Sequence, residues 1–237
     1  HLDPWSRREI KTMSPPVSPA GAVQGKRALF IPALGGNIAD AQYQAIVEKG
    51  LAKLSDLGLD IDVALDDPTQ FQPDIATQMM TSNLAARVRQ MSVEAQQHLG
   101  PGLQSLLGEE EFKSDGVRLQ TDAIDRSRTY DRLERVLSNY DFVLTPTLTA
   151  PPPLADPNSD QSVTINGNKE RINKWWTHLS IANLTGHPAI SIPCGIDAND
   201  LPVGLHAIGG WDRDSDLVSL AFASITCFDW TERRPVY

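Results

Sequence analysis

Short apolar runs, each closed by a proline, recur along this chain and most constrain what it can fold into. They lie at Ala28–Pro32, Asp141–Pro146 and Ala189–Pro193. Each run is too short for an ordinary helix but has the length of a buried strand. Because proline fixes φ and lacks a backbone donor, each strand is expected to end there or to leave its hydrogen-bonded ladder.

Longer segments between these runs carry apolar residues at helical spacing. In residues 38–57 they recur at three- and four-residue steps, which predicts a helix that Asn37 caps and Gly58 ends. Similar patterns predict helices over residues 122–140, 170–185 and 214–227, and helical structure over residues 73–107 with breaks at Gly100-Pro101-Gly102. Further strands are predicted over residues 59–65 and 201–208. Alternating helices and strands predict an α/β fold, a sheet with helices on both faces.

The first residues differ from the rest. Residues 1–25 contain four prolines and little periodicity, which predicts an extended arm or linker. Residues 26–237 then form the folded α/β unit, and 237 residues suffice for one large domain of this kind.

Charge and cysteine content exclude several classes of function. The chain has 21 Lys and Arg against 30 Asp and Glu, a net charge of −9, which disfavours binding to nucleic acid. No apolar run reaches the length of a membrane span. With only two cysteines, Cys194 and Cys227, the sequence suits a reducing compartment, and we expect a cytoplasmic protein.

Common catalytic patterns are absent from the sequence. Gly35-Gly36 follows a strand but lacks the rest of a phosphate-binding motif, so a tight turn is the favoured interpretation. Cys194 with His187 could form a nucleophile pair, but a cysteine in an apolar strand is more often a buried thiol. There is no Ser-Ser pair and no Gly-Ser-rich loop.

Three segments together carry a family resemblance. Tyr140–Thr147 (YDFVLTPT), Asn183–Gly195 (NLTGHPAISIPCG) and Leu201–His206 (LPVGLH) resemble segments of the amidase signature family, in the same order. The resemblance covers roughly residues 25–228 and corresponds to the C-terminal half of that family. It implies a mixed, twisted sheet with helices on both faces, and it makes residues 26–237 an amidase-like C-terminal half.

The resemblance also implies an activity and a missing part. Members of the family hydrolyse amides with a Ser–Ser–Lys triad and a Gly-Ser-rich oxyanion loop, all from the N-terminal half. No residue here matches those elements, so we assign no catalytic residue, and we interpret Lys174 as a solvent-facing lysine. We expect an amide-hydrolysing enzyme that an N-terminal half completes, from the same precursor or a separate chain. The isolated chain would be inactive, and no metal or other cofactor is implied.

The resemblance points to a substrate-pocket wall in the predicted helix over residues 170–185. Asn173, Trp176 and Ser180 would share one helical face, and Trp176 with Ser180 would line a pocket for a small-molecule amide. Trp175 points about 100° away and faces either the core or the same pocket. Met80, in the helix over residues 73–107, would form a second wall.

Two other functions remain open from the sequence. The chain could be a catalytically inactive binding or scaffold domain derived from the same fold. A thiol hydrolase using Cys194 and His187 is the third hypothesis.

Overall fold

A computed structural model describes residues 21–100, 103, 116–153 and 162–228. Residues 1–20 of the predicted arm lie outside this range, and residues 21–25 form turns in which Val23 is buried. The main sheet has five strands in the order β2-β1-β3-β7-β6. These strands are β1 (Arg27–Phe30), β2 (Asp60–Val63), β3 (Phe142–Pro146), β6 (Ala189–Ile196) and β7 (Pro202–Gly209). Because β1 runs parallel to β2 and β3, whereas β7 is antiparallel to β3 and β6, the sheet is mixed.

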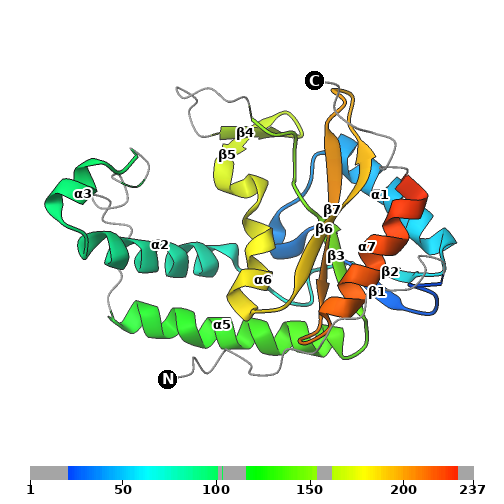
Figure 1. The fold of residues 1–237 in the computed structure, drawn as a ribbon, viewed down its shortest axis with the longest axis horizontal. Helices are drawn as coiled ribbons and strands as arrows, with labels where there is room; N and C mark the ends of the chain where they lie inside the picture. The colour runs from blue at the N-terminus through cyan, green and yellow to red at the C-terminus, as the bar shows by residue number, and fades with distance from the viewer. Residues whose placement is uncertain (1–20, 101–102, 104–115, 154–161, 229–237) are drawn as a thin grey trace.

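Helices cover both faces of this sheet, as Figure 1 shows. One face carries α1 (Ala41–Asp56) and α7 (Asp214–Phe228), and the other carries α2 (Pro73–Arg89), α5 (Gly116–Leu137) and α6 (Ser180–Thr185). The short helix α3 (Val93–Gln97) follows α2. Each face has its own core, with Leu54, Leu144 and Leu205 on the first and Leu133 and Ile208 on the second. The predicted α/β architecture is therefore confirmed.

Helix α1 lies unusually close to strand β6. Gly50, buried on α1, has no side chain, and a Cβ there would lie 2.7 Å from Cβ of Cys194. Real Cβ atoms do not approach so closely, so this helix–strand contact requires glycine. The same contact explains why Cys194 is buried on the α1 face of the sheet.

The two edges of the main sheet differ. Strand β2 is short and carries Asp60 and Asp62, which protect an edge from pairing with another chain. Strand β6 has eight residues, mostly apolar, and its register shifts between Pro193 and Gly195. Among the described residues no strand pairs with the outer side of β6.

Only the last part of the predicted helix over residues 170–185 is an α-helix, α6. A hairpin of β4 (Ser162–Ile165) and β5 (Asn168–Arg171) comes first, followed by the 3-10 turns η3 (Ile172–Trp175) and η4 (Thr177–Leu179) and the short α6. Asn166 and Gly167 have φ of 51° and 78°, the left-handed conformations of a tight hairpin turn. Trp176, with φ −143° and ψ −11°, breaks the helical path between the two 3-10 turns.

Other boundaries also differ from the predicted ones. The helix expected from residue 38 begins at Ala41, and its cap is Asp40, which accepts from the Gln42 amide, rather than Asn37. Helix α5 begins at Gly116 instead of residue 122. The helical segment expected over residues 73–107 divides into α2 and α3, and residues 101–102 and 104–107 lie outside the described residues.

Candidate functional site

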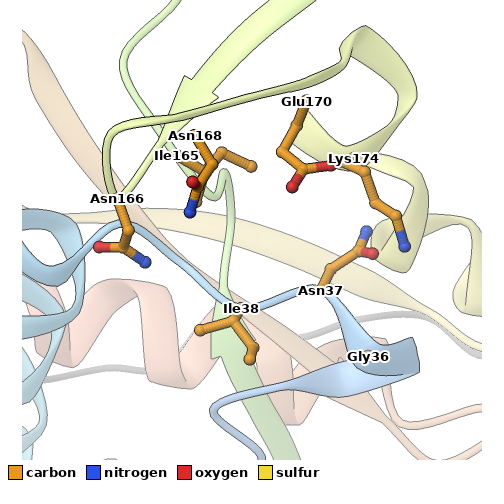
Figure 2. Close-up of a pocket in the computed structure, with 8 residues that line it drawn as sticks. All are labelled: Gly36, Asn37, Ile38, Ile165, Asn166, Asn168, Glu170 and Lys174. Carbon is orange, nitrogen blue, oxygen red and sulfur yellow. The ribbon is translucent and has the colours of Figure 1, made fainter.

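A cavity of about 260 Å³ lies beside the carboxyl ends of β1 and β3, where α/β proteins commonly place their sites. Its walls come from the segment after β1, from the β4–β5 hairpin and from η3. Figure 2 shows the lining residues: Gly36, Asn37, Ile38, Ile165, Asn166, Asn168, Glu170 and Lys174.

The turn after β1 places Asn37 in this cavity. Gly35 and Gly36 have φ of 61° and 73°, and together with Leu34 they form the 3-10 turn η1 (Leu34–Gly36). Such φ values favour glycine, so the interpretation of Gly35-Gly36 as a tight turn holds. The turn leaves Asn37 only 4% exposed, although it lines the cavity.

The hairpin over the cavity is attached to the start of α1. Asn166 Oδ1 accepts from the Ala41 amide at 2.9 Å, and Asp40 Oδ2 accepts from the Asn166 amide at 2.9 Å. On the other side, Thr149 Oγ1 donates to the Lys174 carbonyl at 3.0 Å. These bonds fix both the hairpin and η3, and with them the position of Lys174.

A buried polar cluster lies next to Asn37. Asn37 Nδ2 donates to Thr177 Oγ1 at 3.1 Å and lies 3.4 Å from His178 Nδ1. His178 Nε2 lies 2.8 Å from the Pro146 carbonyl at the end of β3. Burial lowers the pKa of His178 to about 4. The pKa of His206 on β7 is also lowered to about 4, first by burial and then by His178. Both imidazoles are therefore neutral at pH 7.

The sheet face beside this cluster is polar. Thr145, His206 and Ser191 lie opposite one another across β3, β7 and β6. Thr145 Oγ1 and His206 Nδ1 are buried without a hydrogen-bond partner among the described residues. Farther along, the hydroxyls of Thr147 and Ser191 lie 2.6 Å apart. At this end of the sheet the side chains are therefore polar, whereas elsewhere the sheet contributes apolar side chains to the core.

The residues predicted to wall a substrate pocket are spread over several elements, and none lines the cavity of Figure 2. Trp175 Nε1 donates to the Ala150 carbonyl at 2.8 Å, and Trp175 packs on a small core of Ala150, Val163 and Ile165. Ser180 Oγ donates to the Thr177 carbonyl. Trp176 is half-buried, Asn173 Oδ1 is buried without a partner among the described residues, and Met80 on α2 is half exposed.

Sequence reasoning misses the residues that form the cavity. It suggests Asn37 as a helix cap and Lys174 as a helix surface residue, and it does not single out Asn168 or Glu170. The signal that could have found them is Asn166-Gly167, a dipeptide typical of two-residue hairpin turns. A hairpin there brings Asn168 and Glu170 over the end of β1.

The thiol-hydrolase hypothesis is wrong. Cys194 is buried, and its burial raises the thiol pKa to about 12, so almost no thiolate is present at neutral pH. The ring nitrogens of His187 lie 2.8 Å from Thr185 Oγ1 and 2.7 Å from Glu134 Oε1. A histidine engaged on both sides cannot serve as the base for this thiol.

Among the described residues, no three His, Cys, Asp or Glu side chains converge as metal ligands would. No helix within the described ranges combines the length and apolar character needed to cross a lipid bilayer.

Known proteins resemble this chain in sequence. The amidase family model matches residues 12–218. A glutamyl-tRNA(Gln) amidotransferase subunit from Bacillus thuringiensis (strain Al Hakam) is 32% identical over 102 residues, which is 43% of this chain and 19% of that protein. The same protein from Bacillus cereus (strain B4264) matches with the same figures.

Solved structures resemble it in fold. A bacterial aryl acylamidase of the amidase signature family superposes with a TM-score of 0.75 and 20% identity, covering 92% of this chain and 48% of that one. A 6-aminohexanoate cyclic dimer hydrolase gives a TM-score of 0.70 with 16% identity, covering 97% of this chain and 52% of that one. The chain thus corresponds to about half the length of these structures. With the fold shared and the family model matched over most of its length, this chain belongs to the amidase signature family.

Proposed function

We propose that this chain is part of an enzyme that hydrolyses carboxylic amides. It would supply sheet scaffold and a wall of the substrate pocket, while an N-terminal half, in the same polypeptide or a partner chain, supplies the Ser–Ser–Lys triad. The proposal rests on the coverage of about half of each similar structure, and within the described residues β6 is the last strand on its side of the sheet. Two free cysteines suit a cytoplasmic location for this enzyme.

The backbone of β6 is suited to receive a further strand. The Gly209 amide donates to the Pro188 carbonyl at 3.0 Å, so in an antiparallel ladder the alternate residues Ala189, Ser191 and Pro193 direct their backbone groups outward. Proline has no N–H, so an added strand would find donors at Ala189 and Ser191 and would lose its ladder at Pro193. A long apolar edge of this kind is normally covered, because it otherwise promotes aggregation.

The contacts of Lys26 and Lys53 are not those of a catalytic triad. Lys26 Nζ lies 2.9 Å from Asp141 Oδ1 and 3.6 Å from Asp216 Oδ1. Lys53 Nζ donates to the Cys227 carbonyl at 3.3 Å. An acyl-transfer mechanism needs a nucleophile beside its base, and these contacts supply none. We therefore expect the isolated chain to be inactive.

The experiment combines this chain with an N-terminal half that carries the triad. We expect amine release from anilide substrates only when both parts are present, because only then are nucleophile, base and oxyanion donors together. A matched control replaces the triad lysine of the added half with alanine and should abolish turnover. Turnover by this chain alone would overturn the proposal. A complex that binds amides without hydrolysing them would instead favour the inactive binding or scaffold domain.

Within this enzyme, we assign Trp176 and Ser180 to the substrate-pocket wall, with Asn173, Trp175 and Met80 as neighbouring contributors. Trp176→Ala should change the preference of the completed enzyme for acyl groups, because an aromatic wall is lost. The measurement compares kcat/KM across amides of increasing acyl size, with Phe71→Ala, at a buried aromatic residue outside this set, as the control for lost core packing. Identical preference in the Trp176 variant and the parent would contradict this assignment.

A further inference from the structure

We propose that the Asn166-Gly167 turn is a site of spontaneous covalent modification, where deamidation of Asn166 releases the β4–β5 hairpin from α1. Figure 2 shows Asn166 at the turn of the hairpin, beside the chain that leads from Ile38 towards α1. Deamidation converts this neutral, hydrogen-bonded side chain into a carboxylate. The modification goes beyond the proposed amide-hydrolysing function and does not depend on it.

Gly167 makes this asparagine reactive. In deamidation, the backbone nitrogen of the following residue attacks the side-chain amide carbon, and a following glycine has no side chain to obstruct that attack. Asn166-Gly167 is the one Asn-Gly dipeptide in the sequence. Both residues are exposed, and a Cβ built on Gly167 would meet no atom of the described residues within 4 Å. The turn is therefore open to water.

The reaction balances with water as its only co-reactant. The Gly167 nitrogen forms a bond to Cγ of Asn166, while the bond between Cγ and Nδ2 breaks. The proton that the Gly167 nitrogen gives up leaves with Nδ2 as ammonia, and a cyclic succinimide remains. Water then opens the succinimide at either carbonyl. The products are aspartate and isoaspartate, and in isoaspartate the main chain runs through the former side chain.

Hydrogen bonds to the start of α1 restrain Asn166 while the hairpin is docked there. Its Oδ1 accepts from the Ala41 amide at 2.9 Å, and its Nδ2 donates to the Ala39 carbonyl at 3.4 Å. Its backbone amide donates to Asp40 Oδ2 at 2.9 Å. Because Oδ1 and Nδ2 are both held on the α1 side, Cγ reaches the Gly167 nitrogen only after these bonds break. The deamidation rate therefore scales with the fraction of time that the hairpin is undocked.

Both products oppose docking of the hairpin. In aspartate, the oxygen that replaces Nδ2 faces the Ala39 carbonyl, and two acceptors cannot bond to each other. The new carboxylate also lies beside Asp40, which already accepts from the amide of residue 166, and like charges repel. Isoaspartate lengthens the backbone of a tight turn whose flanking residues, Ile165 and Asn168, are paired. Deamidation thus makes a transient undocking permanent.

The reaction is followed by peptide mapping of the full chain during storage in mildly alkaline buffer, with mass spectrometry to separate Asn166 from its products. We expect Asn166 to convert at least about tenfold faster than Asn139, which is also exposed but is followed by the bulky Tyr140. In urea that unfolds the chain, the Asn166 rate should rise about tenfold or more, because the restraining bonds are gone. Equal rates for Asn166 and Asn139 in the folded chain, or equal Asn166 rates with and without urea, would overturn the proposal.

Replacement of Ala41 by proline removes one restraint and preserves the helix. Ala41 is the first residue of α1, where proline is tolerated, and Asp40 before it already has the extended φ of −54° and ψ of 141° that a following proline requires. Ala41→Pro should raise the Asn166 rate about fivefold, the effect of one lost hydrogen bond on the undocking equilibrium. Val93→Pro, at the first position of α3 and after a similarly extended residue, is the matched control and should leave the rate unchanged. An unchanged rate in Ala41→Pro would contradict the restraint.

Asn166→Asp installs one product directly. The Ala41 amide lies in the first turn of α1, where no acceptor inside the helix is available, so its hydrogen exchange reports docking of the hairpin. Exchange at Ala41 should accelerate about tenfold in Asn166→Asp. Asn168→Asp, which adds the same charge to the same hairpin, is the matched control and should leave this exchange unchanged. Parent-like exchange in Asn166→Asp, or equal acceleration in both variants, would overturn the release of the hairpin. No turnover is measured, so these outcomes leave the proposed function standing.

Discussion

Acidification from pH 7 to about 4 is expected to destabilise this protein by several kcal/mol. The pKa values of His178 and His206 are lowered from 6.5 to about 4, chiefly by burial. The unfolded chain therefore takes up protons below pH 6.5, whereas the folded chain does so only near pH 4. Stability is present above pH 6.5 and falls as the pH drops through this window. At 1.36 kcal/mol per pKa unit, each histidine contributes up to about 3 kcal/mol.

The two contributions are not fully additive, because His178 itself lowers the pKa of His206. The measurement is the free energy of unfolding in urea at several pH values between 7.5 and 4. His206→Gln should flatten this pH dependence, whereas His98→Gln, at an exposed position after α3, should leave its slope unchanged. A free energy of unfolding that stays constant from pH 7 to pH 4.5 would contradict the burial of these neutral imidazoles.

Replacing Gly50 by leucine should destabilise the protein by at least about 3 kcal/mol or prevent folding. Any Cβ at this position lies 2.7 Å from Cβ of Cys194, and the backbone carbonyl of Cys194 lies 3.3 Å away. Helix α1 would have to move off β6, which disrupts packing on that face of the sheet. Leucine is a better helix former than glycine by roughly 1 kcal/mol, so the helix itself gains slightly and the net loss reports packing.

The matched control is Ala52→Leu, on the same helix but exposed, which should change stability by no more than about 0.5 kcal/mol. The measurement is the urea midpoint with its m-value, which separates lost stability from a changed unfolded state. Equal midpoints for the two variants would show that α1 does not depend on contact at Gly50.

Sequence patterns are sufficient to predict the strands of the main sheet. They are insufficient to predict the structure of residues 170–185, which contribute to the cavity wall. The end of β3 at Pro146 is visible because proline acts locally, whereas β6 continues past Pro193 to Ile196 with a register shift. The segment over residues 170–185 misleads because its apolar residues recur at helical spacing, although their burial comes from two separate 3-10 turns and α6. Periodicity reports which residues are buried and leaves open the backbone path that buries them.

The candidate site is harder to predict, because its chemistry depends on contacts between distant parts of the chain. Asn37 meets Thr177 and His178 from 140 residues away, and a single sequence contains no signal for that pairing. His178 in turn lies 2.8 Å from the Pro146 carbonyl, which is again distant in sequence. Local rules can suggest Asn37 only as a helix cap, a role that Asp40 has instead.

The turn of the β4–β5 hairpin is hydrogen-bonded to the start of α1, so access to the cavity is coupled to fraying of that helix. Asp40 accepts from Gln42 as a helix cap and from Asn166 in the hairpin turn, and Asn166 accepts from Ala41 in return. Lifting the hairpin therefore leaves the Ala41 amide without its acceptor, while the bond from the Gln42 amide to Asp40 Oδ1 remains. Movement of the hairpin is therefore coupled to fraying at the first residue of α1, so a residue outside the cavity lining, Ala41, influences how the cavity opens.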